Sequence, residues 1–162
     1  MNTHITPYVD IQHACQQNIP VSDEVLADWI SLILPVHQTH AELTLRLVEK
    51  DEIKMLNHTY RKQNKTTNVL AFPSDLPQEI MLQHFFLGDV IICPAVLEEE
   101  SLSFEKSLIP HWAHIVIHGV LHLLGYDHQN DQDTLLMQSL EIQALTKLGF
   151  NNPYALEDLL IE

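Results

Sequence analysis

Apolar and polar residues alternate along this 162-residue chain with two periods, and each period predicts a different kind of element. From Glu42 to Val48 every second residue is leucine, which is typical of a strand with one buried face. From about Val21 to Leu34 the apolar residues recur at helical spacing and predict an amphipathic helix. Ser22 suits the start of this helix as a hydrogen-bond acceptor, and Pro35 suits its end because proline cannot continue the hydrogen-bond ladder.

The other segments follow the same two patterns. We expect strands at Ile5–Val9, Asn68–Phe72 and Leu87–Cys93, and helices at Glu52–Arg61, Pro94–Leu108, Pro110–Leu124 and from a cap at Asp131 or Asp133 to about Gly149. Strands and helices interleave without repeats or linkers, so we expect a single domain over residues 1–162. The predicted fold class is α+β, a small mixed sheet with helices packed on it, or the related α/β layer.

One predicted helix carries histidines at a spacing typical of a metal site. His118 and His122 are four residues apart, so they lie one turn apart on the same helix face. Gly125 is expected to end the helix, and the turn after it brings His128 toward the same side. The spacing H-x₃-H-x₂-G-x₂-H is that of the metzincin proteases. Three neutral imidazoles leave a fourth position open for water, so we predict one catalytic zinc ion held by His118, His122 and His128.

The residue after the first of these histidines argues against proteolysis. In proteases with an H-E-x-x-H motif the glutamate is the general base, whereas this chain has Gly119. Peptide hydrolysis therefore loses its usual base, although a zinc-bound water with a pKa near ~7 would still supply hydroxide. On the same helix we expect His114 to contact substrate, to support a ligand or to be a buried core histidine, and we expect His111 to be exposed.

Composition limits the possible functions. A net charge of −14 argues against general nucleic-acid binding, because phosphate contacts require lysine and arginine. Six of the eight basic residues nevertheless lie in one stretch, called here the basic segment: Arg46, Lys50, Lys54, Arg61, Lys62 and Lys65. This segment is either a solvated face or a local contact for an anionic substrate. Without a signal-like start or a membrane-length apolar run, we expect a cytoplasmic protein with no membrane span and with reduced, buried thiols at Cys15 and Cys93.

The histidine segment resembles the signature of the YbeY family, bacterial endoribonucleases that act as rRNA maturation factors. The stretch His118–His128 matches the family's H-G-x-L-H-L-x-G-Y-D-H at every fixed position. Two further blocks are similar, so the resemblance covers roughly residues 40–150: Leu56-Asn57, Tyr60-Arg61 and Thr67–Pro73 match L-N-x-x-Y-R…T-[DN]-V-L-S-F-P, and Leu87–Ile91 matches L-G-D-[IV]-x-I. Ala71 departs from the serine usual at its position, and Asn68 departs from the aspartate that many members carry.

The resemblance implies a zinc-dependent endoribonuclease that cleaves single-stranded RNA in maturation of the small-subunit rRNA 3′ end and in ribosome quality control. It also implies the small ribosomal subunit and an assembly GTPase as partners. In this hypothesis zinc, with His118 among its ligands, polarises a phosphoryl oxygen or supplies hydroxide. Arg61 stabilises the charge that grows on phosphorus, because its planar guanidinium can bind two oxygens. The expected substrate-binding residues are Arg61, Lys62, Lys65 and His114.

Other interpretations stay open. The protein can be a metallohydrolase of another substrate, with a peptidase disfavoured by Gly119, or a ribosome-assembly binding factor in which zinc only stabilises the fold. Three imidazoles also suit nickel or copper. Arg61 can form an ordinary surface ion pair. Asp127 and Asp89 can orient a ligand histidine, but a turn cap and a strand end are the preferred interpretations for them.

Overall fold

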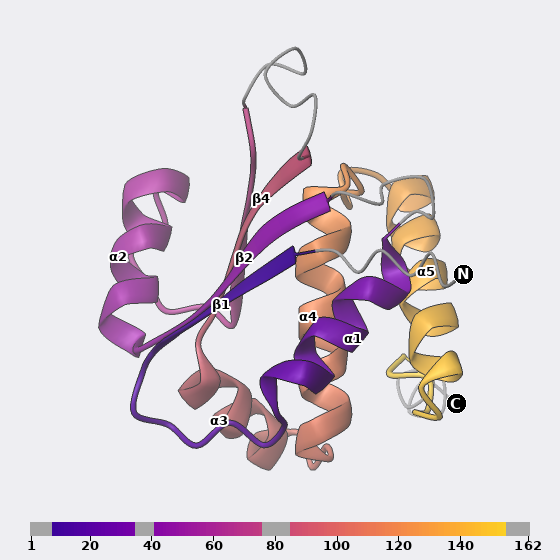
Figure 1. The fold of residues 1–162 in the computed structure, drawn as a ribbon, viewed down its shortest axis with the longest axis horizontal. Helices are drawn as coiled ribbons and strands as arrows, with labels where there is room; N and C mark the ends of the chain where they lie inside the picture. Colours follow the sequence, from indigo (N-terminus) through magenta and orange to yellow (C-terminus); the bar gives the residue numbers. More distant parts are fainter. Residues whose placement is uncertain (1–7, 35–40, 76–84, 155–162) are drawn as a thin grey trace, which may run out of the picture.

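The computed structural model describes residues 8–34, 41–75 and 85–154, and within these ranges a four-stranded sheet is flanked by five helices (Figure 1). The elements are β1 (Tyr8–Ala14), α1 (Asp23–Ile33), β2 (Ala41–Val48), α2 (Lys50–Arg61), β3 (Val69–Pro73), β4 (Phe85–Ile92), α3 (Pro94–Ser103), α4 (Leu108–Leu123) and α5 (Asp131–Lys147). The strand order is β1-β2-β4-β3, in which β1, β2 and β4 run parallel and β3 runs antiparallel to β4. This mixed sheet with packed helices confirms the predicted α+β class.

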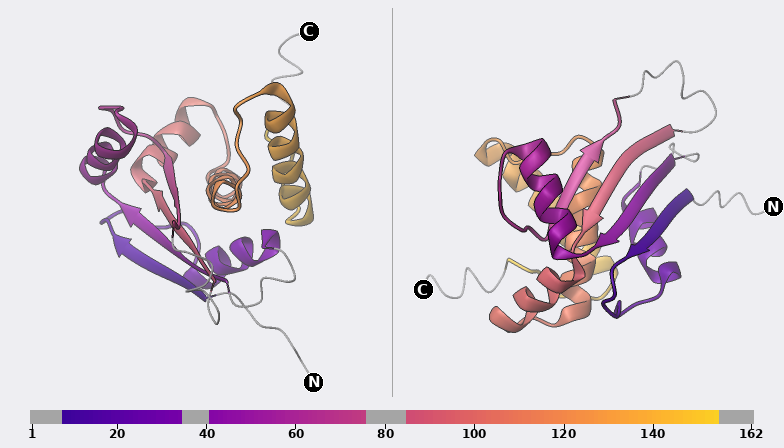
Figure 2. Two further views of the ribbon diagram at one scale, coloured as in Figure 1. Left: turned by 90° about the horizontal axis from the view of Figure 1, so that it is seen from above. Right: turned by 90° about the vertical axis from the view of Figure 1, so that its left-hand side faces the viewer.

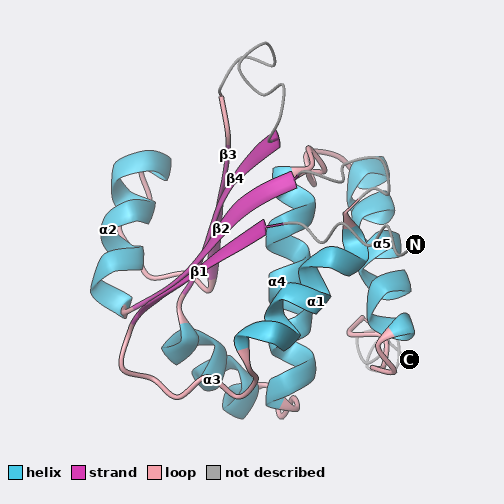
Figure 3. Ribbon diagram, in the orientation of Figure 1, coloured by secondary structure: helices cyan, strands magenta, loops and turns pink. Residues whose placement is uncertain are grey.

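The helices divide between the two faces of the sheet, as the colouring by secondary structure shows (Figure 3). Helices α1 and α4 lie on one face with α5 beyond α4, α2 lies on the other face, and α3 packs against α4. Viewed from above, α4 runs end-on between the sheet and α5 (Figure 2). The leucines of β2 point into the larger core with α1 and α4, as their alternation predicts. A smaller core under α2 joins Val48, Ile53 and Leu70.

Three expectations about the elements are wrong in detail. The first strand covers Tyr8–Ala14 rather than Ile5–Val9, whose first residues lie outside the described ranges. The helix that begins at Pro94 ends at Ser103 rather than Leu108, and the chain takes left-handed backbone at Glu105 (φ 52°) before α4 begins. The last helix is capped by Asn130, not by an aspartate: the Asn130 side chain accepts a hydrogen bond from the Asp133 N–H at 2.8 Å.

The predicted cap of α1 is confirmed, since the Ser22 hydroxyl accepts a hydrogen bond from the Val25 N–H at 3.2 Å. Both cysteines are free, with Cys93 buried and Cys15 only partly so. Within the described ranges, the apolar stretches of the helices are too short to cross a membrane.

Gly119 lies where α4 packs closely against β3 and β4 of the sheet. A Cβ at this position would lie 2.7 Å from Val90 Cγ1 on β4 and 3.2 Å from Val69 Cγ2 on β3. Val90 is fully buried and β-branched, so it has little freedom to move aside. The glycine between the two helical histidines is therefore required by packing, and a glutamate side chain would not fit there.

We expect the substitution Gly119→Ala to destabilise the protein by roughly 1 kcal/mol and by no more than about 2 kcal/mol. Overpacking a core costs about 1–3 kcal/mol, and the better helix propensity of alanine offsets only about 1 kcal/mol of it. Urea denaturation followed by circular dichroism measures the change. The matched test uses Val90→Ala, which removes the clashing methyl. The double variant Gly119→Ala with Val90→Ala should lose less stability than the losses of the two single variants added together. A G119A protein as stable as the original would contradict the packing argument.

Candidate metal centre and substrate cleft

The three predicted ligands come from α4 and the turn that ends it. His118 and His122 lie on α4 and are half-buried, and His128 follows the turn with its side chain 54% exposed. The turn is closed by two hydrogen bonds, from Gly125 N–H to the His122 carbonyl and from Tyr126 N–H to the Leu121 carbonyl, both 3.1 Å. Gly125 has φ 100°, the left-handed conformation expected of a helix-ending glycine. The chain thus reverses and brings His128 back to the two helical histidines.

The geometry of this cluster fits a metal ion. One ring nitrogen of each histidine lies within 4.8 Å of those of the other two, and the Nε2 atoms of His118 and His122 are 3.1 Å apart. Tetrahedral ligands at the zinc–nitrogen distance would be about 3.3 Å from one another. Burial lowers the pKa of His122, and positive charge on His118 or His128 would lower it further. His122 is therefore biased toward the neutral form, which is the form that binds metals.

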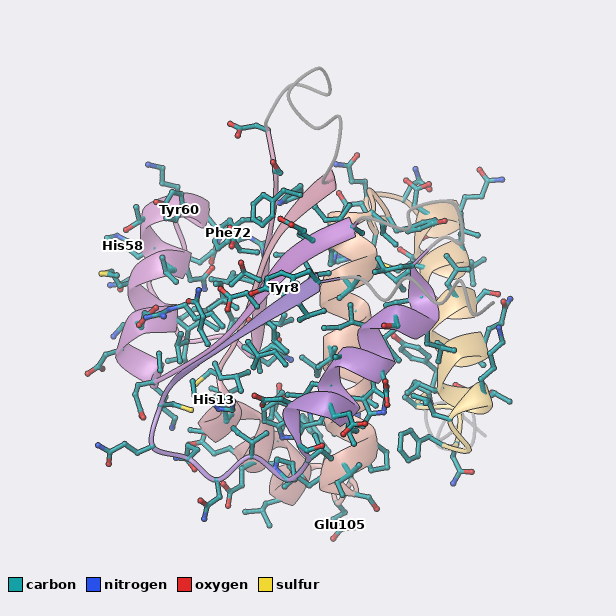
Figure 4. All side chains as sticks on the ribbon, in the orientation of Figure 1. Tyr8, His13, His58, Tyr60, Phe72 and Glu105 are labelled. Atoms are coloured by element: carbon teal, nitrogen blue, oxygen red, sulfur yellow. The ribbon has the colours of Figure 1, made fainter. Side chains whose placement is uncertain are left out.

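A cleft of about 730 Å³ opens beside the three histidines. One wall is formed by the histidines and the turn after α4. The other is formed by the end of α2 and by β3, with Tyr60 and Arg61 on α2 and Phe72 on β3. The Tyr60 ring is 65% exposed and meets the edge of the Phe72 ring at 5.3 Å between centroids. Figure 4 shows these two aromatic side chains lying toward one another between α2 and the sheet.

The backbone of β3 also contributes polar groups to the cleft. Among the described strands β3 is an edge strand, paired only with β4. Hydrogen bonds from Cys93 N–H to the Asn68 carbonyl and from Ser74 N–H to the Leu87 carbonyl show that the even-numbered residues pair with β4. By the alternation of an antiparallel ladder, the main-chain groups of Val69 and Ala71 then point away from β4. Both residues line the cleft, so their N–H and C=O groups are placed to bind a ligand.

The basic segment is split by the fold. Arg46 makes a two-pronged ion pair with Glu52, at 2.7 and 3.1 Å, and Lys50 pairs with Glu99. Within the described part of the chain, Arg61 is the member of the segment that lines the cleft. Lys62 and Lys65 are exposed in the loop after α2, near the cleft but not among its lining residues. The segment is therefore not one continuous substrate surface.

The sequence reasoning missed Glu141, a carboxylate that lies directly behind the histidines. This residue of α5 is 1% exposed, and it accepts hydrogen bonds from His114 Nε2 at 2.9 Å, His118 Nδ1 at 3.0 Å and Tyr154 Oη at 2.6 Å. Burial by itself would raise the pKa of Glu141, but the hydrogen bonds from these partners outweigh it and lower the pKa from 4.5 to about 2. Its one sequence signal is a charged residue on the otherwise apolar stripe of α5 that includes Met137 and Leu145.

The two remaining histidines of α4, His114 and His111, are not among the described residues that line the cleft. His114 lies against Glu141 and Tyr154, so the prediction of a substrate contact gains no support from its position. His111 is buried, not exposed as expected, because its ring pairs with Glu100 at 3.0 Å.

The two aspartates considered as partners of a ligand histidine make no side-chain hydrogen bond to a ring of the cluster among the described residues. Asp127 Oδ1 accepts the His128 N–H at 2.8 Å and so caps the turn, as preferred. Asp89 lies inside β4, paired with Phe72, rather than at the end of the strand.

Comparison with known proteins identifies the family. A family model described as Endoribonuclease YbeY matches residues 11–149. The chain belongs to this family. Proteins named "Endoribonuclease YbeY" from the Corby, Lens and Paris strains of Legionella pneumophila are each 53% identical over 154 residues, 95% of this chain and 98% of theirs. The solution structure of TM1509 from Thermotoga maritima is similar, with a TM-score of 0.58 and 28% identity over 85% of this chain and 86% of that one. The resemblance to the YbeY family predicted from the motifs is confirmed.

Proposed function

We propose that this protein is a metal-dependent endoribonuclease that cleaves single-stranded RNA, with one zinc ion held by His118, His122 and His128. The observation that carries the proposal is the cleft, which combines a three-histidine cluster with an arginine and outward-facing main-chain groups. Membership of the endoribonuclease family supports RNA as the substrate class. The packing of Gly119 against β4 argues against a peptidase, because the site has no room for the usual glutamate base.

In this proposal each group in the cleft has a separate role. A bound zinc ion supplies Lewis acidity toward a phosphoryl oxygen or an attacking water. The guanidinium of Arg61 binds two phosphoryl oxygens and stabilises the negative charge that grows on them. The exposed ring of Tyr60 offers a stacking surface for a base, a contact worth about 1–3 kcal/mol. The outward N–H groups of Val69 and Ala71 can donate to the RNA backbone or to base edges.

The narrower assignments rest on family resemblance rather than on the cleft. We propose that the substrate is ribosomal RNA at the 3′ end of the small-subunit RNA and that the protein also acts in ribosome quality control. The proposed setting is the cytoplasm, and the proposed partners are the small ribosomal subunit and an assembly GTPase. A protein with a net charge of −14 gains little RNA affinity from its bulk charge, so a ribosomal partner that presents the RNA agrees with the composition.

Metal removal tests the proposed activity. We expect a chelator to abolish cleavage of a labelled single-stranded RNA by the purified protein, and added zinc to restore it, because the histidine cluster carries the metal. Circular dichroism should change little on chelation, since the large core beneath α4 is built from apolar side chains and includes none of the three histidines. A duplex of the same RNA is the substrate control and should stay intact. Unfolding on chelation, together with no cleavage by the zinc-loaded protein, would support a purely structural zinc site instead.

A further inference from the structure

His118 has two chemically different neighbours on its two ring nitrogens. Its Nε2 is turned toward the cluster, 3.1 Å from His122 Nε2, while its Nδ1 lies 3.0 Å from the Oε2 atom of Glu141. An ionised carboxylate only accepts hydrogen bonds, so Nδ1 must carry the proton. In the neutral ring the lone pair is then on Nε2, the atom that faces the other two histidines.

Glu141 is itself held from two further directions. His114 Nε2 donates to the same oxygen, Oε2, at 2.9 Å, and the hydroxyl of Tyr154 donates to the other oxygen, Oε1, at 2.6 Å. Three donors from three places in the chain therefore fix both carboxylate oxygens: two from successive turns of α4 and one from the segment after α5. With its side chain 1% exposed, Glu141 has no water to compete for these bonds.

Among the described residues, His118 is the member of the cluster with a hydrogen-bonded carboxylate on its second nitrogen. The nearest comparable contact, between Asp127 Oδ1 and His128 Nδ1, is 3.9 Å and too long for a hydrogen bond. This bond ties His118 to α5, the helix that packs alongside α4 (Figure 2). Of the three histidines, His118 is therefore held most firmly by its neighbours. His128, which is exposed after the turn, is held least firmly.

We propose that Glu141 is a positioning residue for the metal centre: it holds His118 as the Nδ1–H tautomer with Nε2 aimed at the metal, and Tyr154 and His114 lock the carboxylate in place. This inference rests on the proposed metal site and adds to it a dependence on α5 and on the segment that follows it. Partners of this kind orient the ligand ring and raise its basicity, and their loss costs about 10–100-fold in metal affinity.

Another histidine of α4 offers a matched control. Glu100 of α3 accepts a hydrogen bond from His111 Nε2 of α4 at 3.0 Å, with the side chains 27% and 6% exposed, so this is a second, partly buried histidine–carboxylate pair whose histidine is on α4. His111 precedes His118 by seven residues, which places it about two helical turns from the cluster. Substitution of Glu100 by glutamine removes a comparable charge-assisted bond without touching the proposed metal ligands.

The test is the zinc dissociation constant, measured by competition with a chromophoric chelator on the full chain. Glu141→Gln keeps the shape of the side chain and removes its charge, and we expect it to weaken zinc binding about 10–100-fold. Tyr154→Phe removes only the locking hydroxyl and should weaken binding in the same direction by a smaller factor. Glu100→Gln should leave the dissociation constant unchanged even where it lowers thermal stability. If E141Q does not fold, the comparison of Y154F with E100Q decides the point.

A second measurement is independent of affinity. Nitrogen-15 spectra of the histidine rings in the metal-free original protein should show His118 protonated at Nδ1 and not at Nε2. An Nε2–H tautomer at His118, or equal zinc affinities for the original protein, E141Q and Y154F, would overturn the positioning role while leaving the endoribonuclease proposal standing. Absence of zinc binding by the original protein would instead overturn both.

Discussion

Substitution of His118 by alanine is expected to abolish RNA cleavage while the protein stays folded. Loss of a residue that supports a metal ligand lowers metal affinity by up to ~100-fold. Loss of one of the three ligands themselves should weaken zinc binding by more than this. The fold should tolerate the change for two reasons. The side chain is 26% exposed, and Glu141 keeps its hydrogen bonds to His114 and Tyr154. Alanine is also the best helix former, so α4 itself is not weakened.

The measurement combines cleavage of single-stranded RNA, zinc content and circular dichroism on the same preparation. His58→Ala is the matched control, because His58 is an exposed histidine of α2 that does not line the cleft (Figure 4). The control should cleave RNA and bind zinc as the original protein does. If H118A cleaves within a few-fold of the original rate, the histidine cluster is not the catalytic metal site.

The second large effect is expected from Arg61→Ala, which should lower kcat about 10²–10³-fold, equivalent to about 2.7–4 kcal/mol in the barrier. That is the scale for removing one donor that acts on charge developing in the transition state. Arg61 is exposed at the end of α2 and lines the cleft, so its loss should not disturb the core. Zinc affinity should stay unchanged, which separates the role of Arg61 from that of the histidines.

Two further variants sharpen this test. Lys54→Ala removes the same charge from an exposed position of α2 outside the cleft and should leave kcat nearly unchanged. Arg61→Lys keeps the charge but cannot bind two oxygens with one planar group, so it should recover only part of the lost rate. Near-normal cleavage by R61A would show that the arginine is an ordinary surface residue.

Local patterns predicted the elements well where one residue has a single dominant effect. The alternating leucines of β2 all lie in the core, and the left-handed Gly125 ends α4 as expected. Prediction was wrong where several residues compete for one role. Asn130 caps α5 in place of two nearby aspartates, and the helix that begins at Pro94 ends at Ser103 rather than at Leu108.

The basic residues that cluster in the sequence do not form one continuous surface in the fold. Six basic residues in one stretch of sequence suit either a solvated face or a local contact for an anionic substrate, and in the fold Arg46 and Lys50 are paired with Glu52 and Glu99. The Lys50–Glu99 pairing does not follow from sequence spacing, because Glu99 lies on α3, 49 residues further along the chain. What remains for an anionic ligand in the cleft is Arg61, with Lys62 and Lys65 nearby.

The sequence by itself determined the three-histidine cluster, because His118, His122 and His128 belong to one helix and the turn that ends it, and helical geometry with one glycine suffices to bring them together. Only the tertiary structure decided what surrounds them. Arg61 and Glu141 come from α2 and α5, and the packing of these helices around α4 and β3 places one in the cleft and the other behind His118. Helical periodicity identifies which face of α5 is buried, but not that the glutamate on that face meets two histidines and a tyrosine.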